Sequence, residues 1–101
     1  MRCYSSRVRT LIGRAIEVAQ WGQTDTHVKK MNGPLRETYE IVVEGARVTY
    51  RAVYYVTKQP DGPIAVLDVF VKKSTRGNST PAPIERRIVR RLQRIKEVER
   101  E

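Results

Sequence analysis

The sequence predicts an α+β fold: an N-terminal helical part packed on a small antiparallel sheet of three or four strands, followed by a basic C-terminal helix. Three observations lead to this prediction. Apolar residues recur at helical spacing near both ends of the chain. Three runs rich in β-branched and aromatic residues lie between them. The spacers between these runs are short, which favours antiparallel pairing, because parallel strands need long crossover connections.

The first helix is predicted over residues 6–21, where apolar side chains follow each other at intervals of three and four. Ser5 or Ser6 can cap its start, and Gly22 can end it, because glycine readily adopts the left-handed conformation of a helix terminus. Residues 22–34 are then expected to form a loop. The apolar stripe of this helix consists of Val8, Leu11, Ile12, Ala15, Ile16 and Ala19.

Three strands are predicted next, over residues 38–43, 48–56 and 64–71. A turn at 44–46 joins the first two, and the proline- and glycine-rich segment 59–63 is a strong turn signal before the third. The second and third runs are apolar at both alternating positions. Both faces of the sheet are therefore expected to be partly covered.

A polar loop over 74–79 precedes the second predicted helix, which Thr80 caps and Pro81 opens. The surface of this helix carries five arginines within nine residues, 86–94. Such a run is often only a solvated face, and contact with RNA is the competing interpretation. The apolar stripe of the helix consists of Ile84, Ile88, Leu92, Ile95 and Val98.

The chain has 101 residues, which is enough for one domain and too few for two separate cores, so residues 1–101 are expected to form one domain. The net charge of +9 is concentrated at the two ends. Residues 1–33 carry six Lys or Arg against two acids, and residues 71–101 carry ten against four. This asymmetry predicts an anionic partner, with nucleic acid the first candidate; solubility alone is the plainer alternative.

Several classes of protein and site are excluded by composition. No segment approaches the roughly 18 uninterrupted apolar residues of a membrane-spanning helix, and residues 1–7 lack the apolar run of a secretion signal. Cys3 is the only cysteine, so no internal disulfide can form, and one histidine with one cysteine cannot build a zinc site. We therefore expect a cytoplasmic protein that needs no metal or other cofactor.

Acid–base chemistry has few candidate residues. His27 is the only histidine, which excludes a ribonuclease that uses two histidines. In a polar loop next to Lys29, His27 is expected to be structural or exposed. Asp61 and Asp68 stand alone, so a two-metal nuclease site lacks its carboxylates.

RNA can still be cleaved without histidine or metal, because its own 2′-hydroxyl is the nucleophile. A protein need only align that oxygen, assist its deprotonation and neutralise charge on the phosphorus. Arginine grips two phosphate oxygens at once, lysine can act as a base when neighbouring cations lower its pKa, and a tyrosine ring can support an unstacked base. The chain brings these residue types together in Tyr50-Arg51, Tyr54-Tyr55 and Lys72-Lys73.

Each of these residues also has a plainer interpretation. A charged Arg51 in the middle of a strand demands a partner, and an ion pair with Glu40 or Asp68 would supply one. Lys72 and Lys73 can simply be solvated at a strand end. If Arg51 shares a face with Tyr55, a base can stack beside the arginine; Tyr50 and Tyr54 then project to the opposite face and into the core. The sequence leaves these alternatives open.

The chain resembles the RelE/HigB toxins of toxin–antitoxin systems, especially the branch described as phage-derived, over about four-fifths of its length. The strongest signals are the Tyr-Arg-x-x-Tyr strand and the Phe-x-Lys-Lys-Ser strand end; each is weak alone, and their order is fairly specific. The matching segments are Ala19-Gln20-Trp21-Gly22, Lys30-Met31-Asn32-Gly33, Tyr39-Glu40-Ile41, Tyr50-Arg51-Ala52-Val53-Tyr54, Val66-Leu67-Asp68-Val69-Phe70-Val71-Lys72-Lys73-Ser74, Gly77-Asn78-Ser79-Thr80-Pro81 and Arg91-Leu92.

This resemblance implies a toxin that cuts messenger RNA in the ribosomal decoding site and is held silent by an antitoxin, typically a helix-turn-helix DNA-binding protein. Carried over by position, Arg51 would contact the scissile phosphate, and Lys72 and Lys73 would supply charge, with either lysine a candidate base. Tyr55 completes the expected catalytic set. The residues expected to bind ribosomal RNA or the message are Lys29, Lys30, Arg76, Arg87, Arg90, Arg91 and Arg94.

The sequence departs from the family pattern in three places. Family members usually begin with a strand, and only about five residues precede the first predicted helix here, so the sheet is expected to lack one strand. A histidine is common where this chain has Asp68, and some relatives carry lysines near Glu40 and Val42. An acid at position 68 can pair with Arg51 and weaken its grip on phosphate.

Two hypotheses of different classes follow. The first is a ribosome-dependent endoribonuclease toxin that uses the 2′-hydroxyl of RNA as nucleophile. The second is a non-catalytic nucleic-acid-binding or phage-associated protein that keeps the same fold. Growth arrest that a neighbouring gene relieves would separate the first from the second.

Overall fold

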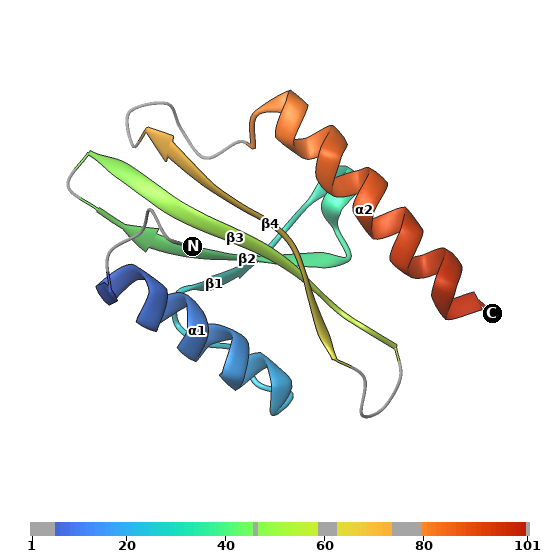
Figure 1. Cartoon of the computed structure of the whole chain (residues 1–101), viewed down its shortest axis with the longest axis horizontal. Coiled ribbons are helices and arrows are strands. Elements are labelled where there is room, and N and C mark those ends of the chain that lie inside the picture. Colours follow the sequence, from blue (N-terminus) through green and yellow to red (C-terminus); the bar gives the residue numbers. More distant parts are fainter. Residues whose placement is uncertain (1–5, 46, 59–62, 74–79, 101) are drawn as a thin grey trace.

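The structure, a computed structural model, describes residues 6–45, 47–58, 63–73 and 80–100. The elements in this part of the chain are, in order, helix α1 (Ser6–Gln20), strand β1 (Val28–Lys30), the 3-10 turn η1 (Gly33–Leu35), strands β2 (Thr38–Glu44), β3 (Val48–Val56) and β4 (Ile64–Lys73), and helix α2 (Ala82–Arg100) (Figure 1). The predicted α+β class is confirmed.

Within the described residues the strands form one antiparallel sheet in the order β1-β2-β3-β4. The loop predicted over 22–34 is therefore wrong in part, because Val28–Lys30 pairs with β2, with Val28 opposite Ile41. The same segment supplies an edge strand after α1, whereas the place of the leading strand that family members usually carry, residues 1–5, lies outside the described residues. A strand of three residues with a single apolar side chain has no readable alternation, so the sequence pattern could not reveal it.

The C-terminal end of α1 was predictable from local sequence. Gly22 has a φ of 79°, and its backbone N–H donates to the carbonyl oxygen of Ala19 at 3.0 Å. This is the left-handed helix terminus that glycine favours. Ser5, one of the two candidate caps at the other end, lies outside the described residues.

The start of α2 differs from the predicted cap. The helix begins at Ala82, where the carbonyl of Pro81 accepts the backbone N–H of Glu85 at 2.9 Å. The Thr80 hydroxyl is buried and has no hydrogen-bond partner among the described residues, so it does not cap the helix. Proline at this point suffices to open the helix, because its φ is already helical and its missing N–H is not needed there.

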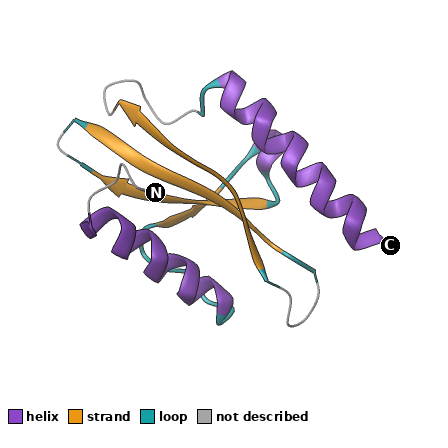
Figure 2. Ribbon diagram, viewed as in Figure 1, coloured by secondary structure: helices purple, strands orange, loops and turns teal. Residues whose placement is uncertain are grey.

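The two helices cover opposite faces of the sheet, as the ribbon shows (Figure 2). Alternate residues of β3 enter the two cores: Ala52 and Tyr54 face α1, and Val53 and Tyr55 face α2. The core role predicted for Tyr54 is confirmed, and Tyr50 packs partly buried against the same core. The prediction that both faces of the sheet are partly covered is confirmed as well.

Helix α2 is attached to its face by polar contacts as well as by its apolar stripe. The Nε of Arg87 donates to Asp68 of β4 at 2.7 Å, and the hydroxyl of Tyr55 donates to Glu99 near the other end of the helix at 2.7 Å. A register shift in the β3–β4 pairing allows both Leu67 and Asp68 to meet α2. The second core thus closes one part of this face and leaves the part around Arg51 to polar residues.

Candidate functional site

A cavity of about 480 Å³ opens beside the β2–β3 hairpin. Its walls come from the first turn of α1, from the segment that leads into β1, and from the β2–β3 hairpin. None of its lining residues belongs to α2. The lining residues are Arg7, Thr26, His27, Val28, Lys29, Val42, Glu44, Thr49 and Arg51.

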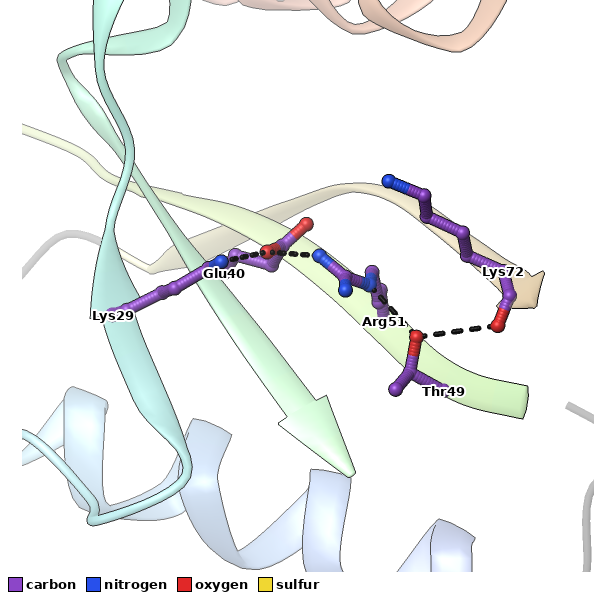
Figure 3. Close-up of polar contacts among 5 residues, drawn as sticks. All are labelled: Lys29, Glu40, Thr49, Arg51 and Lys72. Carbon is purple, nitrogen blue, oxygen red and sulfur yellow. Dashed lines mark hydrogen bonds and ion pairs between the residues drawn. The ribbon is translucent and has the colours of Figure 1, made fainter. Parts of the chain in front are cut away.

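A row of charged and polar side chains crosses the sheet beside this cavity (Figure 3). Each strand contributes at least one member, and all point to the same face. We call this set the charge cluster; it consists of Lys29 of β1, Glu40 of β2, Thr49 and Arg51 of β3, and Lys72 of β4.

Arg51 is the centre of the charge cluster. Its side chain is only 3% exposed, and its Nη1 lies 3.0 Å from Oε1 of Glu40. Its Nε donates to the hydroxyl of Thr49 at 3.0 Å, and that hydroxyl donates to the carbonyl oxygen of Lys72 at 3.3 Å. Of the two partners proposed from sequence, Glu40 therefore pairs with Arg51. Asp68 instead binds Arg87 at 2.7 Å, which corrects the expectation that it would compete for Arg51.

Glu40 is fully buried, and sequence reasoning treated it only as a possible counter-ion. Its Oε1 also lies 3.4 Å from Nζ of Lys29, so one carboxylate oxygen meets two cations. Its other oxygen, Oε2, is buried with no hydrogen-bond partner among the described residues. Burying a carboxylate this deeply requires paired cations, which Lys29 and Arg51 provide.

Lys72 extends the cluster on the β4 side and is 8% exposed. Burial lowers the pKa of its ammonium group, and the nearby cation of Arg51 lowers that pKa further. Glu40 acts in the opposite direction, and the net shift remains downward. A lysine with a lowered pKa exchanges its proton more readily near neutral pH than an ordinary surface lysine does.

Two residues predicted to be catalytic do not join the cluster. Lys73 is exposed, and the alternation of β4 turns it to the face opposite Lys72. Tyr55 shares a face with Arg51, as considered from sequence, but it lies in the core beneath α2. Burial and the hydrogen bond to Glu99 raise the pKa of Tyr55 to about 12. An RNA base cannot stack on a ring that a helix covers, so the placement of Tyr55 in the site is corrected.

The cations predicted to bind RNA are dispersed. Lys29 belongs to the charge cluster, whereas Lys30 lies over the ring of Tyr39, with its Nζ 4.8 Å from the ring centroid. Arg90 and Arg94 are exposed on α2. Arg91 donates to the carbonyl oxygen of Leu67 at 2.6 Å and, like Arg87, lies near Asp68. Arg76 lies outside the described residues.

His27 occupies a place that sequence reasoning missed. Oδ1 of Asp25 accepts its backbone N–H at 2.9 Å and lies 3.0 Å from its Nδ1, and His27 lines the same cavity as Arg51. The backbone N–H of His27, and then its ring, lower the pKa of the Asp25 carboxyl. The Asp-x-His spacing was the available signal, since an aspartate often accepts the backbone N–H two residues on.

Among the described residues, neither helix combines the length and apolar character that crossing a bilayer requires. In the same part of the chain, no three His, Cys, Asp or Glu side chains gather as metal ligands would.

Comparison with known proteins gives a family and no individual relative. No curated protein and no solved structure matches the chain. A family model, Phage derived protein Gp49-like (DUF891), matches residues 1–93. This family is generally associated with the toxins of toxin–antitoxin systems, which suggests an antitoxin partner. The match extends over most of the described fold, including every residue of the charge cluster, and the chain therefore belongs to the Gp49-like family of phage-derived proteins.

Proposed function

We propose that this protein is the toxin of a type II toxin–antitoxin pair and that it cleaves messenger RNA without a metal ion, using the 2′-hydroxyl of the RNA as nucleophile. The observation that carries the proposal is the charge cluster, in which Arg51, Lys29 and Lys72 outnumber the single acid Glu40 beside an open cavity. A site with excess positive charge on rigid strands suits a phosphate whose charge grows during reaction.

In this mechanism the scissile phosphate approaches the cluster from the cavity. Arg51 and Lys29 bind its non-bridging oxygens and stabilise the pentacovalent transition state. The 2′-oxygen forms a bond to phosphorus and gives up its proton to a base. Lys72, with its lowered pKa, gives a proton to the 5′-oxygen as the bond from phosphorus to that oxygen breaks. The products are a 2′,3′-cyclic phosphate on one fragment and a 5′-hydroxyl on the other.

The finer identity follows from the resemblance together with the family. We place the protein among the RelE/HigB-like toxins, with residues 1–101 acting as one domain in the cytoplasm and with the ribosome holding the message. Its antitoxin would be a helix-turn-helix DNA-binding protein encoded nearby. The exposed Arg90 and Arg94 on α2 are suited to contacting ribosomal RNA, since they have no acid of the described chain within ion-pair distance.

One observation favours the second candidate function, a nucleic-acid-binding protein that does not cleave. Glu40 already occupies Arg51 at 3.0 Å, so a phosphate must compete with a buried carboxylate for the same guanidinium. If Arg51 had only a structural role, its ion pair with Glu40 would stay intact when RNA binds. It would bind RNA through its exposed cations and leave the message intact.

The two functions are separated by inducing the chain in cells, alone and with its neighbouring gene, and mapping message ends by primer extension. The decisive variant is the double replacement Glu40→Gln with Arg51→Met, which removes both members of the buried pair and avoids stranding one charge. The control is Arg36→Met, which removes an exposed arginine outside the cluster.

We expect growth arrest and new message ends with the wild type and Arg36→Met, and neither with the double variant. Arrest that the neighbouring gene relieves identifies that gene as the antitoxin. Intact messages in wild-type cells, together with RNA binding in a gel-shift assay, would overturn the proposal in favour of the non-catalytic function.

A further inference from the structure

We propose that His27, oriented by Asp25, is the general base that takes the proton from the 2′-hydroxyl in the cleavage reaction; this inference rests on the proposed function. The geometry behind it is the placement of His27 and Arg51 in the lining of one cavity. His27 would thus supply, within the same site, the base that the 2′-hydroxyl requires.

The strand pairing brings His27 close to Arg51 in the register of the sheet. Val28 packs against the core beneath α1, so Lys29 projects to the other face of the sheet, and His27 lies in the turn immediately before β1. The carbonyl oxygen of His27 accepts the N–H of Val42 at 2.8 Å, and Val42 lies directly opposite Arg51 on the next strand. One intervening residue therefore separates the histidine from the arginine across the sheet.

Asp25 determines which nitrogen of the ring is available. An ionised carboxylate can only accept hydrogen bonds, so the Nδ1 that lies 3.0 Å from Oδ1 of Asp25 must carry a proton. In the neutral ring this leaves Nε2 with a lone pair and no proton. A carboxylate that fixes a histidine in this way is the usual arrangement behind a histidine base.

The cavity suits a nucleotide in size and charge. Its volume of about 480 Å³ falls within the range of small-molecule sites. Arg7, Lys29 and Arg51 supply positive charge around it, and Glu44 is the acid in its lining. The His27 side chain is 39% exposed, so the ring is accessible to an incoming ligand and is not sealed in the core.

Nε2 of His27 removes the 2′-hydroxyl proton while the 2′-oxygen forms a bond to phosphorus. The bond from phosphorus to the 5′-oxygen breaks, and Lys72 donates a proton to that oxygen. The histidine ends protonated and the lysine neutral, and exchange with water restores both. No oxidant, reductant or metal takes part.

The test measures cleavage of a defined message on purified ribosomes by four purified proteins: the wild type, His27→Gln, His27→Ala and the control Gln23→Ala. Gln23 is exposed and lies outside the cavity lining. We expect the control to keep the wild-type rate and His27→Gln to lose about 10²-fold or more, the effect typical of removing a general base. A message with a 2′-deoxyribose at the scissile position should resist every protein.

Added imidazole distinguishes a base from a structural residue. It should restore part of the cleavage by His27→Ala, whose cavity has room for the free ring, and should leave the slowed Lys72→Met variant unchanged. Circular dichroism establishes that the variants fold.

Folded His27→Gln protein that cleaves within about threefold of wild type would overturn the role of His27, yet leave the proposed function standing. Wild-type protein that never cleaves ribosome-bound RNA would overturn both.

Discussion

The two faces of the sheet are built from alternating residues of the same strands, and they differ in what they bury. On the α1 face, Ala52 and Tyr54 of β3 enter a core of apolar side chains. On the α2 face, Val53 and Tyr55 enter a second core, and the same strand then contributes Arg51 to a row of charges. One strand therefore stabilises the fold with one set of side chains and, with the other set, also contributes to a row of charged groups.

The comparison also explains why the charges are tolerated. Burying Arg51 and Glu40 is unfavourable for each alone, and pairing them offsets most of that penalty. A rigid antiparallel sheet holds the pair in one geometry, as a site for phosphate requires.

Breaking the buried pair on the α2 face should have the largest effect. Arg51→Met removes the guanidinium that donates to the buried Glu40, and we expect the free energy of unfolding to fall by about 3–5 kcal/mol. Adding Glu40→Gln to the same protein should recover most of this loss while RNA cleavage remains absent. Urea denaturation of both variants measures the effect. If the double variant were no more stable than the single one, the pair would not be the reason for the loss.

Shortening a buried side chain on the α1 face should lower the stability of the fold and leave the candidate site unchanged. Ile12 is 1% exposed in the first core, and Ile12→Ala should lower the free energy of unfolding by about 2–4 kcal/mol through lost burial and a residual cavity. Cleavage per folded molecule should stay at the wild-type level, because α1 contributes no member of the charge cluster. A matching drop in the activity of the folded fraction would show that the two faces are coupled.

Lys72→Met should separate stability from activity on the α2 face. Burial and Arg51 lower the pKa of Lys72, so the folded state binds its proton less tightly than the unfolded chain does. The resulting penalty is fully present below the folded pKa and disappears as the pH rises through the unfolded pKa, about 10.4. We therefore expect Lys72→Met to be slightly more stable than wild type at pH 7, and the gain to shrink toward pH 10.

The cleavage activity of Lys72→Met should fall, since this variant lacks the proposed proton donor. Parallel urea titrations at pH 7 and pH 10, together with the ribosome cleavage assay, measure both effects. A variant less stable than wild type at pH 7 would mean that contacts of Lys72 outweigh its burial.

Asp25→Asn should give the smallest change in stability, because the hydrogen bonds to the Asp25 carboxylate come from the segment that forms the cavity wall. The hydrogen bonds from His27 lower the pKa of Asp25 in the folded state, so their stabilisation is present above the unfolded pKa of about 3.9 and is lost as the pH falls through the folded value. We expect the variant to be less stable than wild type at pH 7, with the difference closing below about pH 4. Thermal unfolding across this pH range tests the sign, and a difference that persisted in acid would contradict it.

Local sequence was enough to predict much of the fold. The apolar period of α1, the glycine at its end and the β-rich runs of β2, β3 and β4 depend on neighbours a few residues apart, and each appeared close to its predicted place. The edge strand β1 was not predicted, because its pairing with β2 comes from backbone hydrogen bonds that carry no side-chain pattern.

The candidate site was predictable only in part. Arg51 and Lys72 could be placed on one face by counting along their strands, and the pairing of β3 with β4 brings them together. Counting along the strand also put Tyr55 on that face, although it could not show that α2 covers the ring. The presence of His27 and Arg51 in the lining of one cavity depends on the position of β1 at the sheet edge, which no local pattern revealed.

By itself, then, the sequence determined the α+β class, the two helices, the strands that form the centre of the sheet and the excess of positive charge, because periodicity and composition express local preference and burial. Local sequence did not settle that Glu40 pairs with Arg51, that Asp68 holds α2, and that the one histidine lines the cavity. The physical reason is that ion pairs and cavities join residues distant in sequence, and their partners are chosen by strand register and helix packing.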